Sequence, residues 1–266
     1  MDRRATNSSK GGGRVNRTRV HWIIGDSLPE HVALLEAVPG VGNVGKLVVD
    51  ALVRKHPSTL VARLIHPDMP PHSTLDGDGL LVPPSMLVHR VMLPDGRNVV
   101  TVGGDLQPMT AGGQHEVADA ILGLAAAAST PQLLVLAGLA ADVEDKAVHV
   151  ICADAEVRGN LEANDIPVSR DQPEAGMIGV AGLLVALSPI HDVPTVALVA
   201  ETVGASADVR AADRLAKWME QALGLPLEID LDTTEETARK LLASIEVSGS
   251  IEEHLGMPGE ADDFYV

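Results

Sequence analysis

Short runs of apolar residues recur along this chain and indicate a buried sheet. Residues 132–137 and 195–200 consist almost entirely of apolar side chains, a pattern typical of strands buried on both faces of a parallel sheet. Other segments, each bounded by turn residues, are also rich in the residues that favour strands. We predict these further strands at residues 20–24, 31–38, 60–65, 80–82, 86–92, 98–102 and 147–152. The turn signal at 94–96 joins two of them into a β-hairpin.

Helical periodicity alternates with these runs. Apolar residues recur at helical spacing behind residue 46, and again within 114–128, 154–164, 206–223 and 233–245. A further helix is predicted to open at Glu174, where Gly176, Gly179 and Gly182 would share one face and let a neighbouring backbone come close. Strands that alternate with helices predict an α/β domain with helices on both faces of the sheet.

One glycine motif stands between the strand at 31–38 and the helix behind it. In the loop that starts at Pro39 and contains Asn43, residues Gly40, Gly42 and Gly45 spell G-x-G-x-x-G. In this context the motif is a dinucleotide-binding fingerprint, with Asp68 as the candidate ribose ligand. The alternative is that the glycines only let the helix pack closely on the sheet. The predicted hairpin at 86–102 departs from a dinucleotide-binding domain, which would have another helix there.

Charge and composition narrow the function classes. The formal net charge is −17, yet residues 1–19 are basic, so we interpret them as a disordered arm on an acidic body. Such a body repels phosphate backbones, and we expect no nucleic-acid partner. The acid-rich, lysine-poor composition resembles that of salt-adapted archaeal proteins, and the alternative is an ordinary acidic cytoplasmic protein. The single cysteine, Cys152, fits a reducing cytoplasm, and no apolar run is long enough for a membrane helix, so we expect no membrane association.

The C-terminus carries the chain's only phenylalanine and only tyrosine, in the sequence Phe264-Tyr265-Val266. Residues 256–266 are otherwise rich in glycine, proline and acidic side chains, which is typical of a flexible tether. We therefore divide the chain into an arm at 1–19, one domain at 20–255 and a tail at 256–266. A terminal aromatic ring beside a carboxylate suits a partner pocket that combines an apolar slot with a cation. The alternative is that these residues pack on their own domain.

Four motifs together resemble the PAC2 (proteasome assembly chaperone 2) family. They are Val38-Pro39-Gly40-Val41-Gly42-Asn43-Val44-Gly45-Lys46, Gly104-Asp105-Leu106-Gln107-Pro108, the glycine-rich stretch 176–184, and Leu198-Val199-Ala200-Glu201-Thr202. The resemblance implies a three-layer α/β/α sandwich similar to nucleoside phosphorylases, and self-association into a homo-oligomer. The tail resembles the hydrophobic-tyrosine-any-residue motif of proteasome-binding proteins. That resemblance implies docking of Phe264, Tyr265 and the Val266 carboxylate between proteasome α-subunits.

Catalytic signatures are weak in this sequence. It has no G-x-S-x-G nucleophile motif and no H-x-x-x-H or C-x-x-C metal pair, and we interpret its scattered histidines as structural. Asp105 and Glu201 could converge at the carboxyl edge of the sheet for acid–base work, although carboxylates there more often cap a helix. We expect a non-catalytic protein without cofactor or metal. The alternative function is a small-molecule or nucleotide-binding enzyme that uses the loop from Gly40 to Gly45.

Overall fold

The apolar runs form one sheet of eight strands within the described part of the chain, in the order β1-β3-β6-β7-β2-β8-β10-β9. The computed structural model describes residues 16–142, 146–170, 176–204, 206–229 and 231. The four central strands, β7, β2, β8 and β10, run parallel. The outer strands β1, β3, β6 and β9 pair antiparallel, so the predicted hairpin between β6 and β7 is confirmed.

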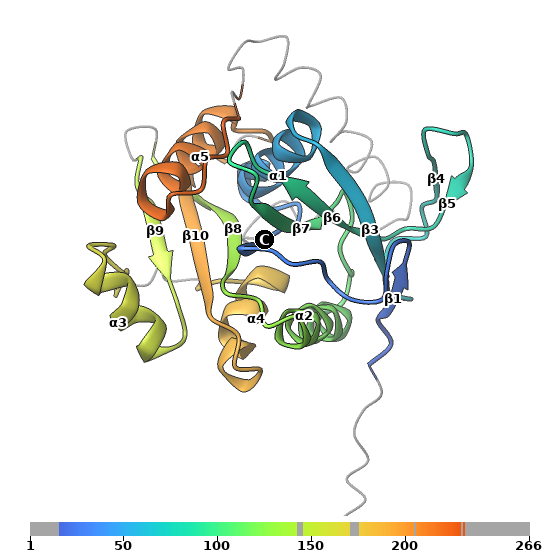
Figure 1. Ribbon diagram of the computed structural model, residues 1–266, viewed down its shortest axis with the longest axis horizontal. Helices are drawn as coiled ribbons and strands as arrows, with labels where there is room; N and C mark the ends of the chain where they lie inside the picture. Colours follow the sequence, from blue (N-terminus) through green and yellow to red (C-terminus); the bar gives the residue numbers. More distant parts are fainter. Residues whose placement is uncertain (1–15, 143–145, 171–175, 205, 230, 232–266) are drawn as a thin grey trace, which may run out of the picture.

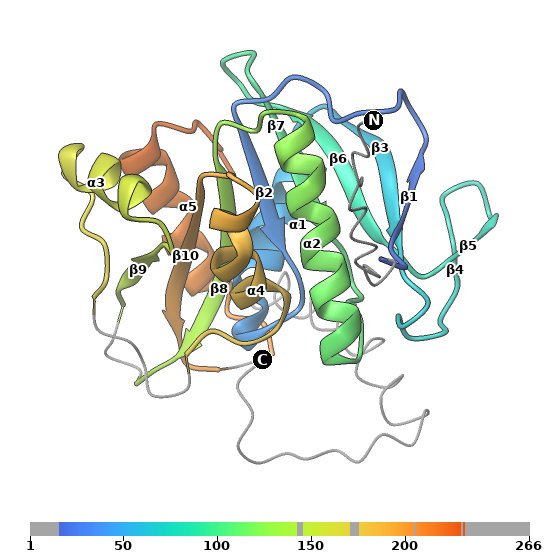
Figure 2. The same cartoon turned by 90° about the horizontal axis from the view of Figure 1, so that it is seen from below.

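Strand bounds match the predicted runs to within a few residues. They are β1 (Arg19–Trp22), β2 (Ala33–Ala37), β3 (Ser58–Ile65), β6 (Met86–Met92), β7 (Asn98–Gly103), β8 (Leu133–Ala140), β9 (Val148–Ile151) and β10 (Thr195–Thr202). A separate two-stranded hairpin, β4 (Thr74–Leu75) and β5 (Leu81–Val82), stands away from the main sheet (Figures 1 and 2).

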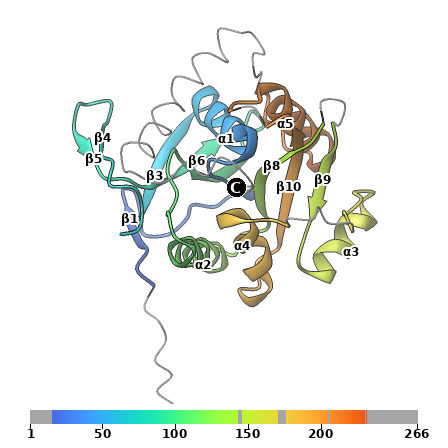
Figure 3. The same cartoon turned by 180° about the vertical axis from the view of Figure 1, so that it is seen from behind.

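Helices cover both faces of the sheet, as the alternating pattern predicts. Helices α1 and α5 pack together on one face, and α2 and α4 pack together on the other, while α3 lies beside β9 at the edge (Figures 1 and 3). Their bounds are α1 (Val44–Lys55), α2 (Ala111–Ala127), α3 (Ala155–Ala163), α4 (Gly179–Leu187) and α5 (Val209–Leu223), with 3₁₀ turns η1 (Val41–Asn43) and η2 (Ser188–Ile190). The predicted helix at 233–245 lies outside the described residues.

Alternation along the central strands divides the core into two layers. In β2, Leu35 belongs to the layer under α1 and α5, whereas Leu34 belongs to the layer under α2 and α4. All five β2 residues are buried, because helices cover both of its faces. The result is a three-layer α/β/α domain. No helix in the described residues is long and apolar enough to cross a membrane.

Two boundaries differ from the sequence-based expectations. The backbone N–H of Arg17 donates to the Glu116 carboxylate of α2 at 2.9 Å, and the Asn16 amide donates to the Glu116 carbonyl at 2.7 Å. Residues 16–19, placed in the arm from sequence, therefore contact the folded body. Helix α4 begins at Gly179 rather than at Glu174. The prediction that Gly176 shares a helical face with Gly179 and Gly182 was wrong, because Gly176 precedes the helix.

Glu36 is the most unusual residue of the sheet. It sits in β2 between Val102 of β7 and Val135 of β8, it is fully buried, and neither carboxyl oxygen has a hydrogen-bond partner among the described residues. Burial alone raises the pKa of Glu36 to about 8. The side chain therefore carries its proton at neutral pH, since an ionised carboxylate here would have no compensating charge.

This raised pKa predicts a pH-dependent stability. Between the ordinary glutamate pKa near 4.5 and the folded-state value near 8, the folded chain keeps a proton that the unfolded chain loses, so stability falls as pH rises. Glu36→Gln should remove this contribution. The stability of the variant relative to wild type should grow by about 1.4 kcal/mol per pH unit across that window. Urea denaturation at several pH values measures it. The exposed substitution Glu30→Gln should show no such growth, and a constant difference for Glu36→Gln would contradict the prediction.

Candidate functional site

The parallel strands bring four loops to one edge of the sheet. The chain leaves β2 through α1 toward β3 on one side, whereas it leaves β8 toward β9 and β10 on the other side. Because these connections diverge, β2 and β8 flank a topological switch point. Open α/β sheets form a crevice outside the carboxyl ends of the strands at such a point.

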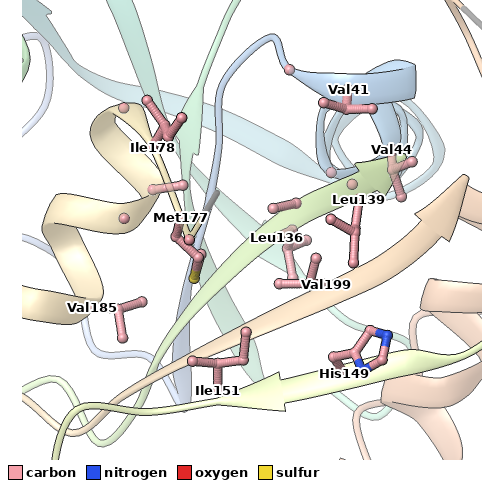
Figure 4. A pocket seen from close by; sticks show the side chains of 18 of the residues that line it. Val41, Val44, Leu136, Leu139, His149, Ile151, Met177, Ile178, Val185 and Val199 are labelled. Atoms are coloured by element: carbon pink, nitrogen blue, oxygen red, sulfur yellow. The ribbon is translucent and has the colours of Figure 1, made fainter. Parts of the chain in front are cut away.

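A cavity of about 700 Å³ occupies this position. Its walls are the loop after β2 (residues 38–41), the start of α1, the end of β8 (136–140), β9, the end of β10, and the stretch from Gly176 into α4. In Figure 4, Met177, Ile178 and Val185 face the side chains of the strands across the cavity. The volume and the mostly apolar lining are those of a small-molecule site.

The glycines of the loop are used for packing. A Cβ atom on Gly45 would lie 2.2 Å from the carbonyl oxygen of Leu136, and one on Gly42 would lie 2.6 Å from the Thr202 hydroxyl. Gly42 also has φ +64°, where a side chain is strained. Gly138 of β8 meets the Val41 carbonyl in the same way, at 2.1 Å. The geometry favours the packing interpretation for Gly42 and Gly45 over the dinucleotide fingerprint.

Other parts of the fold hold this loop in place. The Asn43 amide donates to the carbonyl oxygen of Ser206 at 2.7 Å, and the backbone N–H of Asp208 donates to the Gly42 carbonyl at 2.8 Å. The Gln107 amide donates to the Pro39 carbonyl at 3.2 Å. These contacts tie the Pro39 and Gly42 carbonyls and the Asn43 side chain to residues near α5 and after β7, which fixes the position of the loop.

The lysine that follows the motif is engaged elsewhere. Lys46 is buried, and its Nζ lies 2.5 Å from Asp50 and 2.9 Å from Asp105. Burial opposes the charge on Lys46, but the two carboxylates outweigh it and raise the lysine pKa. Asp68, the candidate ribose ligand, accepts hydrogen bonds from the backbone and hydroxyl of Thr110 at the start of α2. Both side chains are therefore engaged with neighbouring residues of the fold.

Glu201 is paired on its own side of the cavity. Its carboxylate accepts from Nε2 of His149 at 2.9 Å and from the backbone N–H of Ala147 at 2.7 Å. Burial opposes its ionisation, but these two donors together with the nearby charge of Arg214 outweigh burial and lower the Glu201 pKa, so the group is ionised at neutral pH. Glu201 lines the cavity, while Asp105 binds Lys46 and is not part of the lining. The predicted carboxylates therefore occupy one sheet edge with separate partners, and neither caps a helix.

Cys152 is the cysteine of the cavity lining. Burial, the largest cause, raises the pKa of the Cys152 thiol, which disfavours the nucleophilic thiolate. Across the described ranges, no cluster of three His, Cys, Asp or Glu residues could hold a metal ion. Sequence reasoning missed the apolar wall of Met177, Ile178 and Val185. The glycine-rich motif 176–184 contains Met177 and Ile178, but it was interpreted through its glycines alone. The signal that could have located the cavity is that the parallel strands all end at the same edge of the sheet.

Comparison with known proteins adds a family and a fold. The model of the PAC2 family matches residues 34–247. The protein MJ1210 of Methanocaldococcus jannaschii is 26% identical over 229 residues, covering 85% of this chain and 86% of that protein. Among solved structures, Pyrococcus furiosus PbaA, described as an archaeal homolog of a proteasome-assembly chaperone, superposes with a TM-score of 0.70 at 20% identity, covering 89% of this chain and 99% of PbaA.

A second Pyrococcus furiosus protein, PbaB, described as an archaeal proteasome activator, superposes with a TM-score of 0.68 at 20% identity. The match covers 90% of this chain and 100% of PbaB. At this identity the two structures establish the shared fold. The predicted docking residues Phe264, Tyr265 and Val266 lie outside the described residues.

Close packing of the glycine loop predicts a large loss of stability for Gly45→Ala. The new methyl group would meet the β8 backbone, which cannot move aside as a flexible side chain can. We expect a loss of about 2 kcal/mol or more in the free energy of unfolding. Gly123→Ala in α2 is the matched control, since its Cβ meets nothing within 4 Å, and it should gain about 0.5–1 kcal/mol. Equal effects in thermal unfolding would contradict the packing role.

Proposed function

The chain belongs to the PAC2 family, and we propose that it is a non-catalytic proteasome-binding assembly chaperone or adaptor. In this proposal its tail docks into pockets between neighbouring α-subunits of the proteasome core particle. The observation that carries the proposal is the combination of a PAC2 body with the C-terminal sequence Phe264-Tyr265-Val266. The descriptions of PbaA and PbaB, as a proteasome-assembly chaperone homolog and a proteasome activator, support the proteasome as the partner.

The tail's chemistry suits such a pocket. The ring of Tyr265 would fill an apolar slot and its hydroxyl would form a directional hydrogen bond, while Phe264 adds apolar area. The Val266 carboxylate would pair with a lysine and fix the register. Residues 256–263 would supply reach. A single short tail buries little surface, so one tail alone should bind weakly.

Self-association would make that weak binding firm. Several tails on one homo-oligomer raise each other's effective concentration at a symmetric ring. The β4–β5 hairpin supports self-association, because Leu75, Leu80 and Leu81 are about two-thirds exposed on a segment that stands away from the body. We place this function in the cytoplasm, and the acidic composition argues against a nucleic-acid partner.

The proposal does not include catalysis. The packed glycine loop, the engaged Lys46 and the raised pKa of Cys152 all support a binding role over an enzymatic one. These same features weigh against the alternative of a nucleotide-dependent enzyme that uses the loop from Gly40 to Gly45.

Removal of the last three residues should weaken docking strongly. Deletion of 264–266 and Tyr265→Ala should each weaken binding to a purified proteasome core particle by on the order of 30-fold or more, since hot-spot contacts are worth at least about 2 kcal/mol. One residue added after Val266 should also weaken binding, because it displaces the carboxylate. Biolayer interferometry with immobilised core particle measures this.

Tyr265→Phe is the matched control for the ring, since it removes only the hydroxyl and should retain more binding than Tyr265→Ala. The melting temperature of every variant should equal that of wild type. A truncated protein that binds the core particle as tightly as the intact chain would contradict the proposal.

Self-association predicts a solution mass that is a multiple of 27.8 kDa. Multi-angle light scattering at micromolar concentration, in low and high salt, measures it. If the hairpin contributes to the interface, Leu80→Asp with Leu81→Asp should reduce the mass. A single-chain mass for wild type in both salts would remove this part of the proposal.

A further inference from the structure

The cavity at the switch point is a candidate ligand site separate from the proposed docking tail. Its volume of about 700 Å³ lies within the range of small-molecule sites. Its walls combine side chains from the strands with side chains from the start of α1 and from α4, which only the folded domain brings together (Figure 4). The chemistry of its walls determines which ligands it can hold.

Most of the wall is aliphatic. Val41 comes from η1 and Val44 from the start of α1, Leu136 and Leu139 come from β8, and Met177 and Val185 come from the opposite side (Figure 4). Ile178, beside Met177, is 45% exposed although it lines the cavity. An apolar ligand would remove this surface from water, which favours binding in proportion to the area covered.

Charge in the cavity excludes anions. Glu201 is ionised, and no free cation of the described lining opposes a negative ligand. Arg170 is the only lysine or arginine in the lining, but its side chain is 67% exposed and pairs with Glu162 at 2.8 Å. Lys46 is outside the lining and is held by Asp50 and Asp105. A phosphate or carboxylate would therefore meet Glu201, while the cation nearest to Glu201, Arg214, donates to the Glu201 carbonyl and is not part of the described lining.

His149 offers a polar anchor in the wall, in addition to the buried Oε1 of Gln107, which has no partner among the described residues. Nε2 of His149 donates to Glu201, so in the neutral ring Nδ1 is an acceptor, and no described residue donates to it. Both Glu201 oxygens already accept hydrogen bonds, from Ala147 and His149. The anchor thus suits a ligand group that donates one hydrogen bond, such as a hydroxyl or an amide N–H, and does not require a charged ammonium.

We propose that this cavity binds a neutral, largely aliphatic small molecule that carries a hydrogen-bond donor directed at His149. The own tail of the chain is a poor occupant, because the Val266 carboxylate and the acidic residues 260, 262 and 263 would meet the ionised Glu201. Nucleotides are poor occupants for the same reason.

Ligands with the same eight-carbon chain test separately how the charge of the ligand and its hydrogen-bond donor affect binding. Isothermal titration calorimetry of the full chain with 1-octanol should show saturable binding. Octanoate should bind at least tenfold more weakly, octylammonium should bind no more tightly than the alcohol, and methyl octyl ether, which lacks the donor, should also bind more weakly. ATP should not bind. Tighter binding of octanoate, octylammonium or ATP than of 1-octanol would overturn the proposal, as would an ether that equals the alcohol.

Blocking variants test the location. Ala186→Trp in α4 and Ala140→Trp at the end of β8 place a large side chain at exposed positions in the lining, on two different elements. Each should reduce 1-octanol affinity at least tenfold with a wild-type melting temperature. Ala127→Trp on the exposed part of α2 lies outside the lining and should leave affinity unchanged. Wild-type affinity in both folded blocking variants would overturn the assignment.

Deletion of 264–266 separates this site from the proposed function. Unchanged 1-octanol affinity supports an independent cavity, whereas a clear gain in affinity would mean that the tail occupies it and would overturn the proposal. Because the readout needs no proteasome, failure of tail docking and failure of the cavity site are distinguishable.

Discussion

The start of α1 and the end of β8 lie so close that no side chain fits between them, and the carboxyl edge of the sheet depends on this contact. Gly45 faces the backbone of Leu136, and Gly138 faces the backbone of Val41. Both α1 and β8 contribute a glycine to this interface. A larger residue in either element would therefore push the other element away. Backbone packing at this distance also fixes the direction in which the loop from Pro39 leaves β2, and hence one wall of the cavity.

The same contact explains why a nucleotide fingerprint can be present without a nucleotide site. In a dinucleotide-binding domain the motif's glycines bring the backbone close to a pyrophosphate. Here the space next to Gly42 is filled by Thr202, whose hydroxyl donates to Asp208 at 2.7 Å, the residue that caps α5. Glycine spacing specifies a close approach, but the partner in that approach is set by residues far away in the chain, Thr202 for Gly42 and Leu136 for Gly45.

Sequence patterns predicted most of the fold because burial on two faces leaves a local signature. The strands β8 and β10 were found as apolar runs, and the hairpin of β6 and β7 was found from its turn at Gly96. The start of α4 was missed because glycines three apart imitate a helical face. Gly176 has φ +65° and Gly179 has φ +79°, conformations that sequence spacing does not reveal. The pairing of His149 with Glu201 joins neighbouring strands β9 and β10, a pairing that depends on register and not on any motif.

The proposed docking tail and the proposed ligand cavity differ in the charge that they favour in a partner. The tail's proposed partner must offer a cation to the Val266 carboxylate, whereas the cavity of its own domain offers an ionised Glu201. The acidic body repels the acidic residues of the tail as well, with a range of about 10 Å at moderate salt. Self-docking would therefore bring like charges together in an apolar setting, where their repulsion is strongest. In the proposed function this repulsion keeps the terminal residues available to an external pocket, and it leaves the cavity open to a neutral ligand.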